Sequence, residues 1–153
     1  MTSARTFSRC SCSQHAPPFV QSLDEVLFQN SLSGLIVRGP SVSQVEEFVQ
    51  RRGPECIKSR DCSGYTPLLV ASRLGRPEIV ACLLRHGADT TDVTNSLRQT
   101  PLHRAASIGC AESVKILLDF GADRHTMDKH GRTACSIAQE NHFDDVVRLL
   151  LPP

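Results

Sequence analysis

Two thiols and an imidazole near the start of the chain are the residues best suited to bind a metal. They are Cys10, Cys12 and His15. Thiolate and imidazole are ligands that zinc prefers, but three ligands leave a tetrahedral site open. The two-residue spacing usual between zinc-binding cysteines is also missing. We therefore predict no metal or other cofactor, and keep these three residues as an alternative zinc site.

A ten-residue segment with fainter copies on both sides indicates how the chain is built. Residues 100–109 read TPLHRAASIG, residues 66–75 lie 34 positions earlier and read TPLLVASRLG, and residues 133–138 repeat the start of the pattern 33 positions later. A leucine pair recurs at the same interval, at 83–84, 117–118 and 149–150. This period predicts stacked units, none of which could bury its apolar face alone.

The repeated segments also predict how each unit folds. Thr66 and Thr100 are suited to cap a helix with their hydroxyl groups, and the proline after each can occupy the first helical position, where a missing N–H costs nothing. Gly75 and Gly109 would end that helix in the left-handed conformation. A second, leucine-rich helix should follow in each unit and supply most of its buried apolar surface.

The period and its signature resemble the ankyrin repeat. The resemblance covers residues 61–151 well and 27–60 loosely, and it implies a mainly α fold, an ankyrin-repeat solenoid of helix-turn-helix units with projecting hairpin loops. The chain also resembles the group of small stand-alone ankyrin-repeat proteins typified by ankyrin repeat domain-containing protein 39, a group that lends architecture more than function.

Composition divides the chain near residue 22. The first 20 residues contain no acidic side chain and are rich in Ser and Thr, which predicts a disordered leader at 1–22. An acid-free, Arg- and Ser-containing start is also typical of a mitochondrial presequence, and that alternative stays open. The predicted ankyrin-repeat domain, 23–153, consists of a degenerate repeat at 23–60, repeats at 61–94 and 95–127, and a capping repeat at 128–153.

Charge and cysteine usage argue against several functions and locations. The net charge of +1 argues against bulk nucleic-acid binding. The sequence contains no run of 18 apolar residues, so we expect no membrane-spanning helix. The chain has seven cysteines, and Cys82 and Cys135 fall on core positions of the repeat, which indicates reduced thiols. We expect a cytoplasmic and/or nuclear protein, with the mitochondrion as the alternative.

Catalysis would most plausibly use a cysteine and a histidine that lie close together in the sequence. Cys110 and His103 could act as nucleophile and base. In the ankyrin family, however, the histidine of the Thr-Pro-Leu-His signature forms hydrogen bonds between neighbouring units. The chain also lacks a phosphate-binding glycine loop, an H-E-x-x-H motif and a nucleophile elbow. We therefore predict that the protein is not an enzyme.

The resemblance implies a binding surface as well, because ankyrin loops and first helices form a concave groove whose variable positions contact a partner. Carried over to this sequence, the partner-binding positions are Ser63, Tyr65, Arg73, Leu74, Arg98, Gln99, Arg104, Ser107, Ile108, Lys129, His130 and Arg132. Five of these twelve are basic, and Glu140 is the single acidic residue expected beside them. The predicted groove is therefore basic although the whole chain is almost neutral.

These features predict a non-catalytic protein–protein interaction module or adaptor. Its partner would be another protein that presents an acidic or phosphorylated segment, and the chain would work as a monomer or as a subunit of a hetero-complex. A leader-dependent metal-binding or mitochondrially targeted ankyrin protein is the alternative. Nucleic acid is less favoured because Tyr65 is the one aromatic residue of the predicted groove, and no membrane is expected.

Overall fold

The computed structural model describes residues 31–94 and 96–151. Within them the chain forms helices and no β-strand. The helices are α2 (Leu32–Val37), α3 (Val42–Arg52), α4 (Glu55–Lys58), α5 (Pro67–Leu74), α6 (Pro77–Arg85), α7 (Pro101–Ser107), α8 (Ala111–Asp119), α9 (Ala134–Glu140) and α10 (Asp144–Leu150). The predicted leader, with the alternative zinc ligands Cys10, Cys12 and His15, lies outside the described residues.

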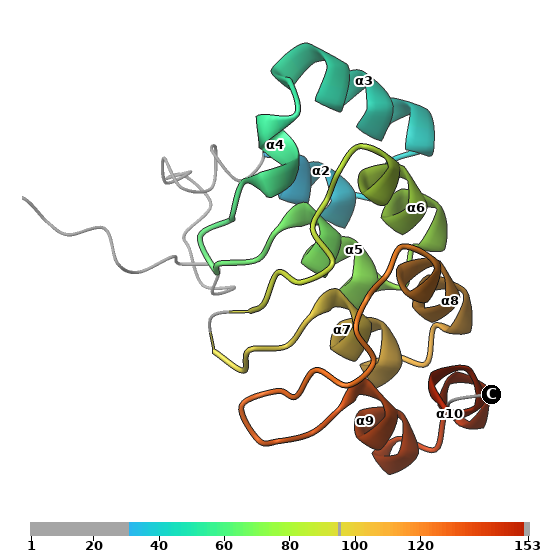
Figure 1. Cartoon of the computed structure of the whole chain (residues 1–153). Helices are drawn as coiled ribbons and strands as arrows, with labels where there is room; N and C mark the ends of the chain where they lie inside the picture. Colours follow the sequence, from blue (N-terminus) through green and yellow to red (C-terminus); the bar gives the residue numbers. More distant parts are fainter. Residues whose placement is uncertain (1–30, 95, 152–153) are drawn as a thin grey trace, which may run out of the picture.

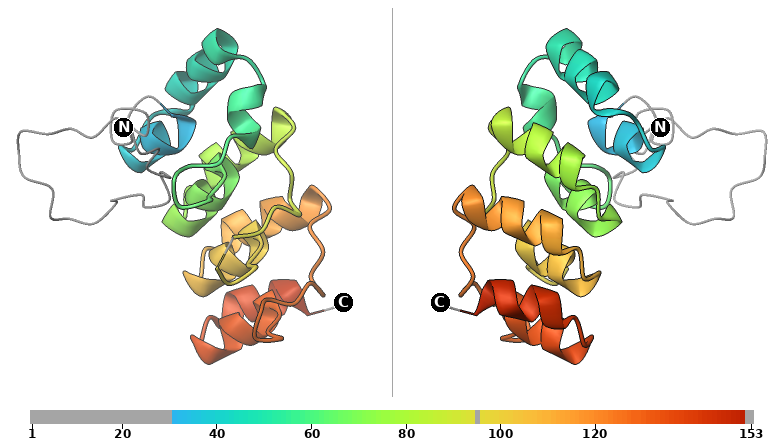
Figure 2. Two further views of the ribbon diagram at one scale, coloured as in Figure 1. Left: turned by 90° about the vertical axis from the view of Figure 1, so that its left-hand side faces the viewer. Right: turned by 90° about the vertical axis from the view of Figure 1, so that its right-hand side faces the viewer.

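The helices form pairs that stack side by side (Figures 1 and 2). The first helices of the pairs, α2, α5, α7 and α9, pack on one another in that order, and the second helices, α3, α6, α8 and α10, do the same in a parallel row. The connecting loops project from one side of the stack (Figure 1). The predicted solenoid of helix-turn-helix units is therefore confirmed, and each predicted repeat contains one helix pair. The exact repeat boundaries stay a prediction.

The predicted helix starts are correct, but one predicted cap is not. Pro67 and Pro101 occupy the first positions of α5 and α7, as expected. The Thr100 hydroxyl accepts from the backbone N–H of His103, and the His103 ring accepts from the backbone N–H of Thr100. The Thr66 hydroxyl, in contrast, is buried without a hydrogen-bond partner among the described residues. The corresponding third position of α5 is Leu69, which cannot complete a reciprocal cap.

The helical pattern predicted for the first unit is only partly within the described residues, because residues 23–30 lie outside them. Apolar spacing predicts a helix from about residue 23 to 38, whereas α2 begins at Leu32. Ser31 caps it, with an extended backbone and a hydroxyl that accepts from the N–H of Gly34 at 3.0 Å. An extended N-cap ends any continuous helix at that point. The short helix α4, which the sequence analysis did not predict, packs between α3 and α5.

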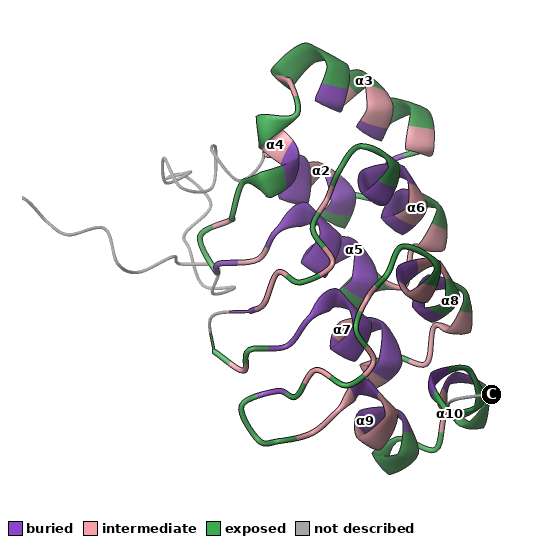
Figure 3. Ribbon diagram, in the orientation of Figure 1, coloured by how far each residue is buried: buried purple, intermediate pink, exposed green. Residues whose placement is uncertain are grey.

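Both rows of helices contain buried residues (Figure 3), and the buried hydrophobic residues form one core cluster. Leucines of successive units, including Leu68, Leu102 and Leu117, are at most 1% exposed. Burying each contributes roughly 1.5–3 kcal/mol. Ala105 and Ala106 are fully buried, and such small side chains let α5, α7 and α9 lie close together. No helix among the described residues is long and apolar enough to cross a bilayer.

Candidate protein-binding surface

Each of the three long loops is closed by a tight turn at its tip. The backbone N–H of Asp61 donates to the carbonyl of Tyr65, and that of Asp128 donates to the carbonyl of Arg132, both at 2.9 Å. The Asp61 carboxylate also accepts from the backbone N–H groups of Ser63 and Tyr65. An aspartate that bonds to backbone N–H groups further along stabilises such a turn. The loop side chains are therefore presented from fixed turns.

Neighbouring loops are also bonded to one another. The Arg60 guanidinium donates to the carbonyl of Val93 at 3.0 Å and to the Asp92 carboxylate at 2.9 Å. The backbone N–H of Lys129 donates to the carbonyl of Leu97 at 2.9 Å. The loops and the adjoining ends of α5, α7 and α9 thus form one continuous surface. We call it the loop-side surface; that it forms the predicted binding groove stays a prediction.

A tyrosine from the first loop lies against two arginines at the centre of the loop-side surface. The Arg104 guanidinium donates to the Tyr65 hydroxyl at 2.6 Å, and its central carbon lies 5.4 Å from the centre of the tyrosine ring. The corresponding carbon of Arg73 lies 5.6 Å from the same ring centre. Both distances suit cation–π attraction, which orients the guanidinium groups. We call these three residues the Arg–Tyr cluster.

The Arg–Tyr cluster is positively charged. Neither Arg73 nor Arg104 forms an ion pair with an acidic residue within 31–94 and 96–151. The buried Nε of Arg104 has no hydrogen-bond partner among these residues. Leu74 and Ile108, at the ends of α5 and α7, are each 39% exposed. The Arg–Tyr cluster therefore has guanidinium donors that are not used within the described residues, and an exposed aliphatic residue ends each of the two helices that carry its arginines.

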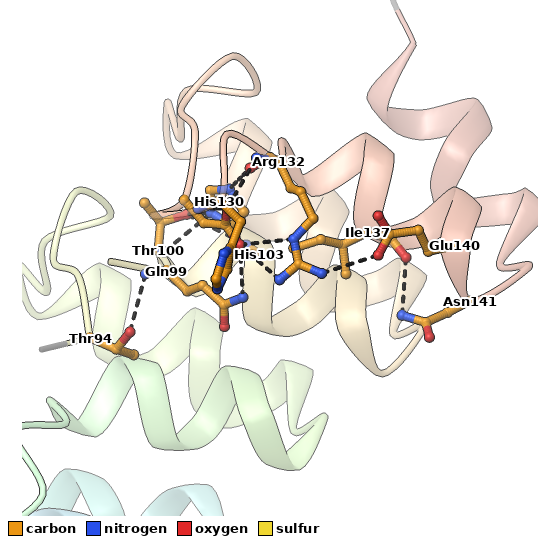
Figure 4. A network of polar contacts seen from close by, with 10 residues as sticks. Thr94, Gln99, Thr100, His103, His130, Arg132, Ile137, Glu140 and Asn141 are labelled. Atoms are coloured by element: carbon orange, nitrogen blue, oxygen red, sulfur yellow. Dashed lines mark hydrogen bonds and ion pairs between the residues drawn. The ribbon is translucent and has the colours of Figure 1, made fainter. Parts of the chain in front are cut away.

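The predicted site residues Gln99 and Arg132 have a structural role (Figure 4). Gln99 is buried, and its side-chain amide donates to the Asp128 carboxylate at 3.2 Å. The Arg132 guanidinium donates to the same carboxylate at 3.0 Å and to Glu140 at 3.1 Å. These bonds occupy the side-chain amide of Gln99 and neutralise the charge of Arg132. The two side chains are therefore engaged within the protein, whereas the sequence analysis expected them to contact a partner. The basic surface is reduced to Arg73, Arg98, Arg104 and Lys129.

Asp128 is the electrostatic centre of that network. Burial alone would raise the pKa of its carboxyl group. Hydrogen bonds from the backbone and side chain of Arg132, the side chain of Gln99 and the backbone of His130 outweigh burial and hold the pKa well below its usual range. Asp128 in turn raises the pKa of Arg132. The third loop is therefore held to the second by a buried carboxylate that stays ionised.

The predicted structural role of His103 matches its contacts. Its Nδ1 accepts from the backbone N–H of Thr100 at 3.2 Å, which leaves Nε2 to donate to the carbonyl of Arg132 at 3.0 Å. Burial lowers the pKa of His103, consistent with a neutral ring. The Cys110 thiol donates instead to the Ser113 hydroxyl at 3.1 Å. The two ring nitrogens and the thiol are thus engaged elsewhere, and the arrangement is not that of a nucleophile and its base.

The remaining predicted positions lie where a partner could reach them. Ser63, Arg98, Lys129 and His130 are exposed on the loops. Arg98 has φ of 51°, the left-handed conformation that Gly64 and Gly131 adopt in the other two loops. Ser107 is half-buried, and its hydroxyl donates to the carbonyl of Arg104 at 2.8 Å.

Comparison with known families identifies the repeat. A family model described as "Ankyrin repeats (3 copies)" matches residues 89–153, and one described as "Ankyrin repeat" matches residues 63–96. The chain carries ankyrin repeats. Proteins built from such repeats are generally non-catalytic interaction modules, which agrees with the role predicted for this chain.

Two curated proteins match the ankyrin repeats of this chain. B-cell lymphoma 3 protein of Homo sapiens is 36% identical over 94 residues, and B-cell lymphoma 3 protein homolog of Mus musculus is 34% identical over the same length. In each case the match covers 60% of this chain and 21% of the relative. The chain thus spans about a fifth of the length of the relatives that it matches.

Sequence reasoning missed Asp128, which organises the third ankyrin loop. A signal was present, because Asp61, Thr94 and Asp128 recur at the repeat interval and all three accept backbone N–H groups at a loop tip. The repeat interval does not show, however, that Gln99, which lies 29 residues before Asp128, donates to the Asp128 carboxylate. That contact depends on how the repeats stack.

Proposed function

We propose that this chain is a non-catalytic interaction module that binds an acidic or phosphorylated segment of another protein on its loop-side surface. The observation that carries the proposal is the Arg–Tyr cluster, Tyr65, Arg73 and Arg104. Its two guanidinium groups have no acidic partner among the described residues, although five ion pairs form elsewhere in the same part of the chain. A bound carboxylate or phosphate would supply the missing acceptor.

The cluster is suited to such a partner because it is already oriented. Arginine donates two parallel hydrogen bonds to a planar carboxylate or to a phosphate, which makes it more selective than lysine for these groups. The contacts of Arg73 and Arg104 with Tyr65 restrict both side chains before binding, and this lowers the entropy cost of ordering them. Leu74 and Ile108 can meanwhile bury an apolar side chain of the partner.

Charge distribution favours the same face. Arg98 and Lys129 are exposed on neighbouring loops and would extend the positive surface beyond the cluster. Acidic residues such as Asp119, Asp144 and Asp145 are exposed on the second helices, in the other row of the stack. An acidic segment would therefore be attracted to the loop-side surface, and the attraction should weaken as salt increases.

The test removes two arginines and keeps the fold. The double variant Arg73→Ala/Arg104→Ala is compared with Arg85→Ala/Lys115→Ala, which removes the same charge from exposed positions on α6 and α8. Partners captured by the wild-type chain are ranked by their loss in the first variant, and peptides covering their acidic or phosphorylated segments are titrated by fluorescence anisotropy at several salt concentrations.

We expect the Arg73/Arg104 variant to lose about tenfold or more in affinity per arginine, because a hydrogen bond to a charged group contributes about 1.5–3 kcal/mol. The slope of affinity against salt should also fall. The control variant should bind as the wild type does. Unchanged affinity and unchanged salt dependence in the Arg73/Arg104 variant would show that the Arg–Tyr cluster is not the binding site.

The remaining features of the proposal can be tested with the same proteins. Binding of a random oligonucleotide at low salt, lost in the Arg73/Arg104 variant, would replace the protein partner by nucleic acid. We also propose a cytoplasmic and/or nuclear location and a monomer or hetero-complex subunit, which a tagged full-length chain and its size in solution would test. The narrower likeness to the group typified by ankyrin repeat domain-containing protein 39 stays a prediction.

A further inference from the structure

Three side chains with metal-binding atoms meet between α3 and α6, away from the loop-side surface. They are Glu46 on α3, Cys82 on α6, and His86, the C-cap of α6. One ligand atom from each lies within 4.8 Å of the other two, and the Cys82 sulfur is 4.0 Å from a Glu46 carboxylate oxygen. Cys82 is buried, Glu46 is half-buried and His86 is exposed. The cluster therefore reaches from the core to the surface.

The contact between α6 and α8, one repeat further along the stack, has different residues at the positions equivalent to Cys82 and His86. The residues one repeat after Cys82 and His86, 34 positions later, are Ile116 and Phe120. Ile116 and Ala81 line a hollow between α6 and α8, and the other residues around this hollow are mostly charged. At the α6–α8 contact the positions equivalent to Cys82 and His86 therefore carry no metal-binding atom. At the α3–α6 contact, a thiol, an imidazole and a carboxylate occupy the equivalent region.

We propose that Glu46, Cys82 and His86 bind a zinc-type divalent metal ion that links the degenerate first repeat to the second. Cysteine, histidine and glutamate are all zinc ligands, and thiolate with imidazole favours zinc or cobalt over magnesium and calcium. Cys82 and His86 are four residues apart, so their side chains leave the same face of the helix. Three protein ligands leave one position for water or for a group of a partner.

Charge balance supports such an ion. A Zn²⁺ ion with a Cys82 thiolate, a Glu46 carboxylate and a neutral His86 ring carries no net charge, which suits a partly buried place. The thiol gives its proton to solvent when the Zn–S bond forms. Without metal, burial and the nearby Glu46 carboxylate raise the pKa of the Cys82 thiol, so the metal must displace a firmly held proton.

The distances allow the site to close without moving the helices. Metal–ligand bonds of about 2.0–2.3 Å place tetrahedral ligand atoms roughly 3.5 Å apart. The present separations are at most 4.8 Å, so the three atoms need to approach one another by about 1.3 Å at most. Cys82 is fixed in the core, while Glu46 and His86 have freedom to rotate because both have solvent-accessible side chains.

Cobalt spectroscopy of the full chain tests the proposal directly. Reduced, metal-free protein is titrated with Co²⁺, and the thiolate-to-cobalt charge-transfer band and the visible bands of tetrahedral cobalt are recorded. Zinc is then added to displace cobalt. We expect both sets of bands in the wild type, no charge-transfer band in Cys82→Val, and at least about tenfold weaker cobalt binding in Glu46→Gln and His86→Gln.

Matched controls separate this site from other thiols and imidazoles. Cys110→Ser and His125→Gln remove the same groups elsewhere, and Cys10→Ser/Cys12→Ser removes the alternative zinc ligands near the start of the chain. These variants should keep the bands. The proposal is wrong if the wild type gives no charge-transfer band, if the band survives in Cys82→Val, or if it disappears in Cys10→Ser/Cys12→Ser. His86→Gln alters an exposed residue, so its result remains informative if Cys82→Val fails to fold.

Discussion

Replacing Asp128 by asparagine tests whether one carboxylate holds the last two loops together. One carboxylate oxygen accepts from the backbone N–H groups of His130 and Arg132, and the other accepts from the side chains of Gln99 and Arg132. Asparagine keeps a carbonyl oxygen for the backbone groups. Its NH₂ group, however, faces the Gln99 and Arg132 donors, so these side-chain bonds are lost.

The cost follows from the bonds that asparagine cannot make. A hydrogen bond to a charged group contributes about 1.5–3 kcal/mol, and Gln99 would be left buried without its acceptor. The Arg132 side chain is 35% exposed, so water can replace part of what it loses. We therefore expect Asp128→Asn to lower the free energy of unfolding by about 2–4 kcal/mol. The matched variant is Asp61→Asn, because Asp61 accepts backbone N–H groups in the equivalent turn; it should cost at most about 1 kcal/mol.

Urea unfolding followed by circular dichroism measures both variants, and pH provides a second test. The folded protein holds the pKa of Asp128 below its unfolded value of about 3.9. Its contribution is therefore present above that pH and is lost as pH falls further. The difference in free energy of unfolding between the wild type and Asp128→Asn should therefore become smaller as the pH is lowered below about 3.9. The role given to the Asp128 carboxylate would be refuted if Asp61→Asn and Asp128→Asn lowered the free energy of unfolding equally. It would also be refuted if the difference between wild type and Asp128→Asn did not change with pH.

Two further predictions concern packing. Gly109→Ala and Gly121→Ala both place a side chain at positive φ, which costs about 1–2 kcal/mol of stability in each case. The two sites differ in their surroundings. A Cβ at Gly109 would lie 2.5 Å from a Phe143 ring carbon, whereas a Cβ at Gly121 meets nothing within 4 Å. Gly109→Ala should therefore lose a further 1–3 kcal/mol or so in urea unfolding, and equal losses would contradict the Phe143 contact. Leu117→Ala, at a fully buried position, should cost about 2–5 kcal/mol in the same assay; a cost below about 1 kcal/mol would contradict its place in the core.

The sequence determined the features that depend on neighbouring residues. A threonine followed by proline starts a helix, and a glycine after it allows the chain to turn, because both effects act within one turn of backbone. Repetition of these signals every 33 or 34 residues was enough to predict the stacked helix pairs. His142 shows the limit of this reasoning, since it adopts a positive φ of 60° at the position that Gly75 and Gly109 occupy in the two preceding repeats.

Only the tertiary structure decided which side chains meet between repeats. Tyr65 bonds to Arg104 39 residues away, Gln99 to Asp128 29 residues away, and the Cys82 thiol faces Glu46 36 residues away. None of these spacings equals the repeat interval, so periodicity could not pair them. Their contact depends on the distance and rotation between stacked helices, which are set by the packing of the whole core. The same packing leaves Arg73 and Arg104 without an acidic partner among the described residues while it neutralises Arg132.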